Sequence, residues 1–208
     1  MSGDSTAEWF RYLACGSRGW SIWKPLRALF TILVAGLIDK VALTLVERTQ
    51  PYIAASSLYE AGDLSGAVRI TDQIIVSMPH KDESVVWAYS LKGFIASDQH
   101  KLDEAISEYR QAIQLDPKSA LPHNNLGNVL SNQGKAEEAI SEYRQAIQLD
   151  PKDALPHNGL GNVLSDQGKA EEAISEYRQA IQLDPKSAPL HYNLGNVLKD
   201  QGDRKSVV

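Results

Sequence analysis

The sequence predicts an all-α protein, a solenoid of antiparallel helix pairs preceded by an N-terminal hydrophobic helix. The first observation is a repeat: segment 120–153 returns as 154–187 with only three differences, Asn125/Gly159, Asn132/Asp166 and Asp153/Ser187. The second is the period, because a further copy starts at 188 and a diverged copy fills 86–119, which gives 34 residues, the length of a helix–turn–helix unit. The third is that proline and glycine stand where such helices must begin and end.

Each unit has the signals of two helices. Pro122 and Pro156 fall in a first helical turn, where a missing N–H costs little. Gly134, Gly168 and Gly202 stand at the expected end of each first helix, in a left-handed turn. The second helix has a buried stripe at helical spacing, formed by Ala139, Tyr143, Ala146 and Ile147. One hairpin cannot bury this stripe alone, so neighbouring units are expected to stack.

The period also predicts the domain organisation. Residues 1–19 are a polar and aromatic segment that we expect to be poorly ordered, and residues 20–47 are the hydrophobic helix. The predicted repeats and the insertion between the first two are 48–81 (degenerate), 82–85 (insertion), 86–119, 120–153, 154–187 and 188–208, the last with a first helix only.

The hydrophobic segment 20–46 leaves three interpretations open. Its uncharged core, Ala28–Ile38, has eleven residues, whereas a helix needs roughly 20 apolar residues to cross a bilayer. Extension back to Trp20 makes a span possible, since Lys24 and Arg27 can reach the interface. The segment is thus a transmembrane helix, a helix that lies on a membrane or partner, or a cap on the first repeat. The predicted localisation is membrane-associated, and otherwise cytoplasmic.

Composition and spacing point away from nucleic-acid binding, metal binding and catalysis. The net charge of −5 lacks the basic excess of a nucleic-acid binder. His123, His157 and His191 recur with the repeat, and stacked helices place such equivalents roughly 10 Å apart, too far to share one zinc ion. No phosphate-binding loop or nucleophile with an evident base occurs, so we expect no enzyme activity, no metal and no cofactor.

The repeats resemble the tetratricopeptide repeat (TPR) family. The resemblance rests on small, aromatic and proline residues at the family's spacing: Gly93, Ala105, Tyr109, Ala112 and Pro117, then Gly127, Ala139, Tyr143, Ala146 and Pro151, then Gly161, Ala173, Tyr177, Ala180 and Pro185. Lys92 departs from the pattern, because the family usually has leucine there, and looser packing of that repeat is expected. The resemblance implies a right-handed superhelix whose first helices line a concave groove that binds peptides or partner helices.

The same resemblance implies which residues line the groove. They are Ser90, Phe94, Ser97, Asp98, Asn124, Asn125, Asn128, Ser131, Asn132, Asn158, Asn162, Ser165, Asp166, Tyr192, Asn193, Asn196, Lys199 and Asp200. Asn128, Asn162 and Asn196 form a ladder of amides that can pair with an extended peptide backbone. Lys199 is the only base in this set, so we expect neutral or basic partner segments.

The leading prediction is therefore a non-catalytic scaffold or adaptor that binds a protein partner in the groove and is tethered through 20–46. One alternative is a detached, substrate-recruiting part of an enzyme system, because the repeats are similar to the array of protein O-GlcNAc transferases. Another is self-assembly, because Leu194, Val197 and Leu198 of the fifth repeat lack a covering second helix in this sequence.

Overall fold

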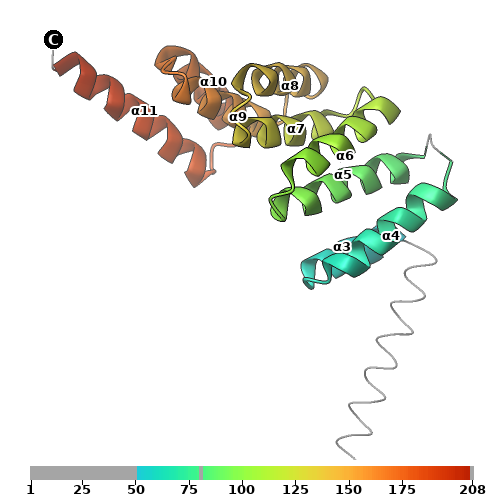
Figure 1. The fold of residues 1–208 in the computed structure, drawn as a ribbon. Helices are drawn as coiled ribbons and strands as arrows, with labels where there is room; N and C mark the ends of the chain where they lie inside the picture. Colours follow the sequence, from blue (N-terminus) through green and yellow to red (C-terminus); the bar gives the residue numbers. More distant parts are fainter. Residues whose placement is uncertain (1–50, 80–81, 207–208) are drawn as a thin grey trace, which may run out of the picture. The chain divides into compact units, whose positions relative to one another are not determined.

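The computed structural model describes residues 51–79 and 82–206, with side chains through 202, and these residues are helical apart from short connections (Figure 1). The helices are α3 (Pro51–Glu60), α4 (Leu64–Ser77), α5 (Glu83–Asp98), α6 (Leu102–Leu115), α7 (Ala120–Asn132), α8 (Ala136–Leu149), α9 (Ala154–Asp166), α10 (Ala170–Leu183) and α11 (Ala188–Ser206). The predicted all-α class is confirmed for this part of the chain.

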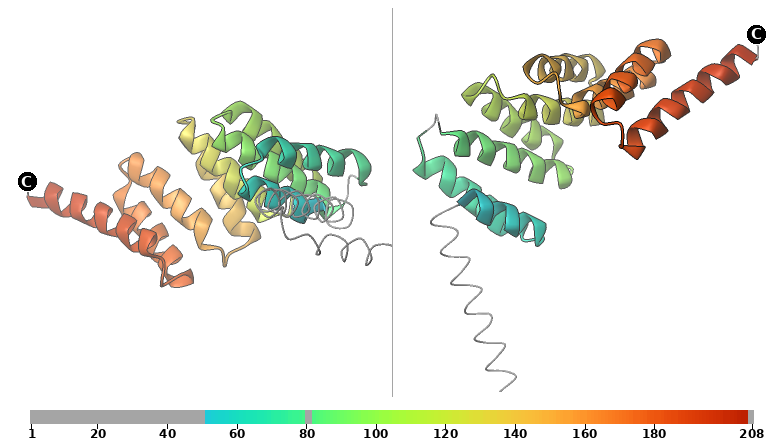
Figure 2. Two further views of the ribbon diagram at one scale, coloured as in Figure 1. Left: turned by 90° about the horizontal axis from the view of Figure 1, so that it is seen from below. Right: turned by 180° about the vertical axis from the view of Figure 1, so that it is seen from behind.

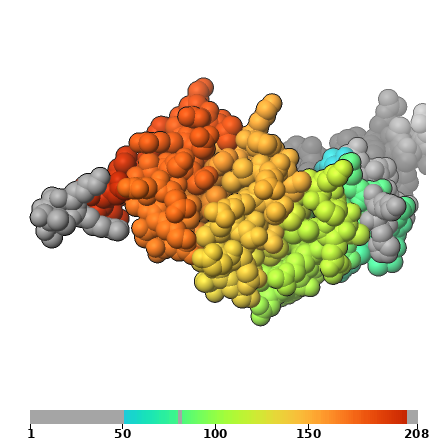
Figure 3. Space-filling model, turned by 90° about the horizontal axis from the view of Figure 1, so that it is seen from above, coloured from blue at the N-terminus to red at the C-terminus, as the bar shows by residue number. Residues whose placement is uncertain are grey.

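The helices pair into hairpins that follow one another in chain order (Figures 1 and 2). Each second helix packs against the first helix of its own hairpin and the first helix of the next. The first helices α3, α5, α7, α9 and α11 also contact each other in turn. In the space-filling view the repeats form successive slabs (Figure 3). One layer of this part of the molecule is thus made of first helices and the other of second helices.

The core of the second, third and fourth hairpins is a tyrosine ring packed on a glycine. Tyr143 and Tyr109 are 2 % and 1 % exposed, and Ala139 and Ala146 beside Tyr143 are fully buried. A β-carbon on Gly127 would lie 2.8 Å from Cε1 of Tyr143, so only glycine permits this approach. Burying one such ring contributes about 1.5–3 kcal/mol. The predicted stripe is therefore the hairpin core, and Ile147 lies half-buried at its edge.

The first helices of the third and fourth repeats end as the sequence predicts. Gly134 and Gly168 have φ of +75° and +74°, the left-handed conformation in which a side chain is strained. The N–H of Lys135 donates to the carbonyl of Leu130, which closes the turn as a Schellman motif. In the second repeat His100 takes the glycine's place with φ of +58°.

The prediction that Gly202 ends the first helix of the fifth repeat is wrong. α11 continues through Gly202 to Ser206, and Gly202 does not have a positive φ. In the third and fourth repeats a second helix begins two residues after the glycine and packs back against the first helix. The Lys-Ala-Glu-Glu sequence that leads into those second helices is replaced after Gly202 by Asp-Arg-Lys-Ser, and these residues continue α11.

Lys92 replaces the family's buried leucine without loosening its hairpin. A β-carbon on Gly93 would lie 2.8 Å from Cε1 of Tyr109, as close as at the equivalent Gly127. The Lys92 ammonium lies 3.0 Å from Asp72 of α4 and 3.3 Å from Glu108 of α6. Burial would lower the pKa of Lys92, but the two carboxylates outweigh it and the pKa is raised. An ion-paired lysine thus connects the first and second repeats.

The predicted hydrophobic helix at 20–47 and the segment 1–19 lie outside the described residues. Within 51–79 and 82–206, no helix combines the length and the apolar character needed to cross a membrane. α5 begins at Glu83, inside the segment 82–85 that the sequence set apart, and Asp82 caps it by accepting a hydrogen bond from the N–H of Ser84.

Candidate protein-binding face

The residues predicted to line the groove all lie on the first helices but differ in exposure. Those exposed to solvent are Phe94, Asp98, Asn128, Asn132, Asn162, Asp166, Tyr192, Asn196, Lys199 and Asp200. Those half-buried are Ser97, Asn125, Ser131, Asn158, Ser165 and Asn193. Ser90 and Asn124 are buried, 7 % and 4 % exposed, and the Ser90 hydroxyl donates to the carbonyl of Val86 in its own helix. These two therefore offer little surface to a partner.

The central asparagines are held in one orientation by the core tyrosines. The hydroxyl of Tyr143 donates to Oδ1 of Asn128, and the hydroxyl of Tyr177 donates to Oδ1 of Asn162. The donor–acceptor distance is 2.7 Å in both hydrogen bonds. Burial raises the pKa of both tyrosines to about 12, and nearby Asp166 adds to the effect at Tyr177. Both hydroxyls thus remain protonated donors at neutral pH. With Oδ1 engaged, the Nδ2 donors of Asn128 and Asn162 are the groups left for a partner.

A second amide contact joins the fourth and fifth repeats. Nδ2 of Asn193 on α11 lies 3.0 Å from Oδ1 of Asn158 and 3.3 Å from Oδ1 of Asn162, both on α9. Oδ1 of Asn162 therefore accepts two hydrogen bonds, which matches its two lone pairs. The predicted row of parallel amides is thus partly an internal network between neighbouring helices.

This network is interrupted at the third and fourth repeats. In the fifth repeat Asn193 donates to Asn158 of the fourth repeat. The corresponding residues one repeat earlier are Gly159 and Asn124, and because Gly159 has no side chain it cannot donate to Asn124. Oδ1 of Asn124 is buried and has no hydrogen-bond partner. The ring of Tyr143 fills the place of the missing side chain, because a β-carbon on Gly159 would lie 2.4 Å from its Cε1. The glycine thus replaces a polar contact with a packed ring.

Sequence reasoning missed two exposed leucines on the same stripe. Leu121 and Leu155 are 51 % and 61 % exposed, and Leu121 lies seven residues before Asn128, two turns away on the same side of α7. Their spacing from the asparagines could have placed them on this face. We call the exposed and half-buried stripe of α7, α9 and α11 the amide face; it contains these leucines and the predicted residues of the third to fifth repeats.

The first two repeats carry aromatic side chains instead. The rings of Tyr52 and Trp87 stand edge to face with centroids 6.2 Å apart, and those of Tyr59 and Phe94 with centroids 5.4 Å apart. We call these four residues the aromatic patch. The Tyr59 hydroxyl donates to the Asp98 carboxylate, and this hydrogen bond is the largest cause of the raised pKa of Tyr59. Of this group the sequence analysis identified only Phe94 and Asp98.

Two of the three recurring histidines each connect the two helices of one hairpin. Nδ1 of His123 lies 2.6 Å from Glu142, and Nδ1 of His157 lies 2.7 Å from Glu176, each bridging the two helices of one repeat. Among the described residues no three His, Cys, Asp or Glu side chains gather closely enough to hold a metal. Glu108 is the counterpart of Glu142, and because Tyr89 replaces the histidine there, Lys92 is its partner instead.

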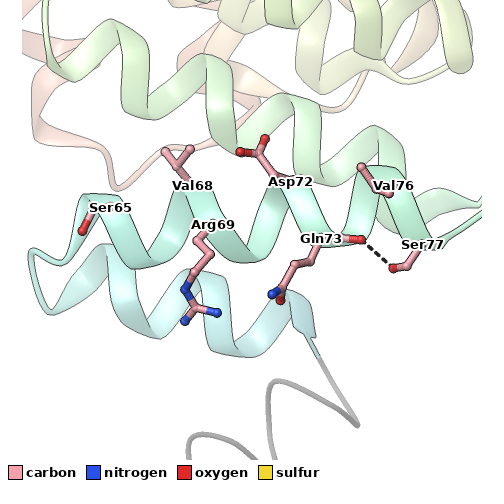
Figure 4. A pocket seen from close by; sticks show the side chains of 7 residues that line it. All are labelled: Ser65, Val68, Arg69, Asp72, Gln73, Val76 and Ser77. Atoms are coloured by element: carbon pink, nitrogen blue, oxygen red, sulfur yellow. Dashed lines mark hydrogen bonds between the residues drawn. The ribbon is translucent and has the colours of Figure 1, made fainter.

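Two surface hollows in the described part of the chain lie away from this face. One, of about 850 Å³, runs along α4 between Ser65 and Ser77 (Figure 4). Another, of about 370 Å³, lies between α6 and Lys135. Neither contains a residue of the amide face or the aromatic patch.

Comparison with known proteins settles the family. The sequence matches the family model of the TPR repeat at three consecutive positions, residues 97–134, 127–168 and 161–202, which together span just over half of the 208 residues. The chain belongs to the tetratricopeptide repeat family. TPR repeats are typically modules for protein interaction. No curated protein sequence matches the chain.

Solved TPR structures share the fold at low sequence identity. A crystal structure of MamA has a TM-score of 0.62 at 23 % identity, covering 73 % of this chain and 86 % of MamA. The first TPR of Spaghetti (RPAP3), bound to the HSP90 peptide SRMEEVD, has a TM-score of 0.57 at 22 % identity, covering 60 % of this chain and 99 % of that domain. The TPR domain of Arabidopsis OM64 has a TM-score of 0.53 at 19 % identity, covering 55 % and 95 %. At these identities the likeness supports the TPR fold alone.

Proposed function

We propose that this TPR protein is a non-catalytic scaffold that holds an extended segment of a protein partner on the amide face. The observation that carries the proposal is the fixed orientation of Asn128 and Asn162, whose Oδ1 atoms accept from Tyr143 and Tyr177. Both asparagines are exposed, so their Nδ2 groups are preorganised donors on consecutive repeats. Such donors match main-chain carbonyl groups.

The spacing of the repeats favours an extended partner. Adjacent packed helices stand about 8–10 Å apart. An extended chain advances about 3.3 Å per residue, so about three residues of the partner span the distance between two rungs of the face. Leu121 and Leu155 lie two helical turns from Asn128 and Asn162 on the same side of their helices, and offer apolar contact to partner side chains that reach toward them. Backbone hydrogen bonds thus supply affinity and the leucines add selectivity.

The charge of the face favours neutral or basic segments. Asp98, Asp166 and Asp200 are exposed on the first helices, and Lys199 is the only base among the residues predicted to line the face. The RPAP3 TPR was solved with a peptide that contains three acidic residues. We expect this chain to bind such a peptide poorly, because like charges across an interface are costly.

A display library of random 12-residue peptides, selected on the immobilised full chain, tests the proposal. Peptides recovered on the wild type should bind Asn128→Ala/Asn162→Ala about 5- to 150-fold more weakly, since two hydrogen bonds of about 0.5–1.5 kcal/mol each are lost. The matched control is Gln145→Ala/Gln179→Ala, which removes exposed amides from the second helices of the same repeats. Equal binding to all three proteins would contradict the proposal.

Tethering through residues 20–46 stays a prediction, as that segment lies outside the described residues. Carbonate extraction of membranes from cells that express the full chain tests it. A chain that pellets after the wash supports an integral anchor, and a chain that washes off contradicts it.

A further inference from the structure

The aromatic patch continues the stripe of the amide face into the first two repeats. Phe94 stands 34 residues before Asn128, and Trp87 stands 34 residues before Leu121, so each occupies the same place in its repeat. The first helices α5 and α7 are in contact. A segment that lies along the amide face therefore meets aromatic rings when it reaches α5 and α3.

The patch has a defined geometry. Tyr52 and Tyr59 are seven residues apart on α3, and Trp87 and Phe94 are seven apart on α5, so each pair shares one side of its helix. The two contacts between the helices have interplanar angles of 78° and 71°, the favoured edge-to-face arrangement.

Two of these rings are partly open to solvent, and a carboxylate stands beside one of them, Phe94. Tyr52 and Phe94 are each 43 % exposed. Asp98 lies one helical turn after Phe94, is exposed, and is held by the Tyr59 hydroxyl. The nearby Lys92 is tied to Asp72 and Glu108. Exposed aromatic faces next to a fixed carboxylate are the surroundings that a cation prefers.

We propose that the aromatic patch and Asp98 bind a basic side chain, arginine or lysine, of the segment held on the amide face. The inference rests on the proposed function, because the amide face positions the segment. The cation stacks on the exposed ring of Phe94, and its N–H groups donate to the Asp98 oxygens that the Tyr59 hydroxyl leaves open. Arginine suits the site best, since its planar guanidinium stacks on rings and pairs with a carboxylate at once.

The peptide selection above provides the probe. Peptides recovered on the wild-type full chain should carry arginine or lysine at one aligned position. For a recovered arginine peptide, replacing that arginine with citrulline, which keeps the shape and removes the charge, should weaken binding about five- to tenfold. On Phe94→Leu and on Asp98→Asn the difference between the two peptides should fall below about threefold. Phe94→Leu keeps the apolar bulk, and thermal melting confirms that both variants fold.

The outcomes separate this inference from the proposed function. Peptides that depend on Asn128 and Asn162 but show no basic preference would overturn the cation site and leave the amide face intact. A basic preference that persists in both Phe94→Leu and Asp98→Asn would also overturn it. A selection that yields no binding peptide would overturn both proposals.

Discussion

Replacing Gly159 with alanine should destabilise the protein, although alanine is the better helix former. Gly159 lies inside α9, where glycine-to-alanine substitution ordinarily stabilises by about 1 kcal/mol. Here the new β-carbon would lie 2.4 Å from Cε1, 2.5 Å from Cζ and 2.8 Å from the hydroxyl oxygen of Tyr143. The ring must move, which costs about 1–3 kcal/mol as overpacking. Its displacement also breaks the hydrogen bond to Asn128, worth about 0.5–1.5 kcal/mol.

The expected net loss is about 0.5–3.5 kcal/mol, because the helix gain offsets only part of these costs. Urea unfolding of the full chain, followed by circular dichroism at 222 nm, measures it as a lower midpoint. Gly195→Ala is the matched control, since nothing lies within 4 Å of its β-carbon position in α11, and it should be neutral or stabilising. A Gly159→Ala protein as stable as the wild type would refute the reasoning. Sequence comparison alone suggests no penalty, because Asn125 and Asn193 carry β-carbons at the equivalent positions.

Two further predictions concern the second repeat and the core tyrosines. His100→Gly should raise the urea midpoint, since glycine removes a left-handed strain of about 1 kcal/mol at φ +58°; an unchanged midpoint would contradict this. Burial raises the pKa of Tyr143 and Tyr177 from 10 to about 12, so their share of the stability is complete below pH 10 and is lost as pH rises from 10 to 12. Unfolding at pH 8, 10 and 11, with absorbance at 295 nm to follow ionisation, should show the midpoint fall above pH 10, and a flat profile would argue against burial of these rings.

The helical hairpins were predictable from the sequence because their causes are local. The 34-residue period, the stripe around Tyr143 and the turns at Gly134 and Gly168 depend on helix periodicity and on backbone conformation. Gly202 has the same local signal but does not end its helix. In the earlier repeats the second helix packs back against the first. The few residues around the glycine do not reveal whether that contact forms.

The details of the candidate face depend on contacts between helices. The hydrogen bond from Tyr143 to Asn128 joins residues 15 apart, and that from Asn193 to Asn158 joins residues 35 apart. Which amide atom forms a hydrogen bond depends on the rotation of one hairpin relative to the next. The 34-residue repeat length does not specify that rotation. The burial of Asn124 has the same origin, because an adjacent helix decides whether its side of α7 is covered.

The ionic contacts of the second repeat make its junction with the first sensitive to salt. Lys92 joins α5 to Asp72, which is 54 % exposed, and Asp98 joins α5 to Tyr59 of α3. Mobile ions screen exposed charges over about 8 Å at physiological ionic strength, and over about 3 Å at 1 M salt. The ring of Tyr143 against Gly159 contains no charge and is unaffected by such screening. Salt concentration therefore acts unequally along the array: it weakens the Lys92 contacts with α4 and α6 and leaves the packing of Tyr143 on Gly159 unchanged.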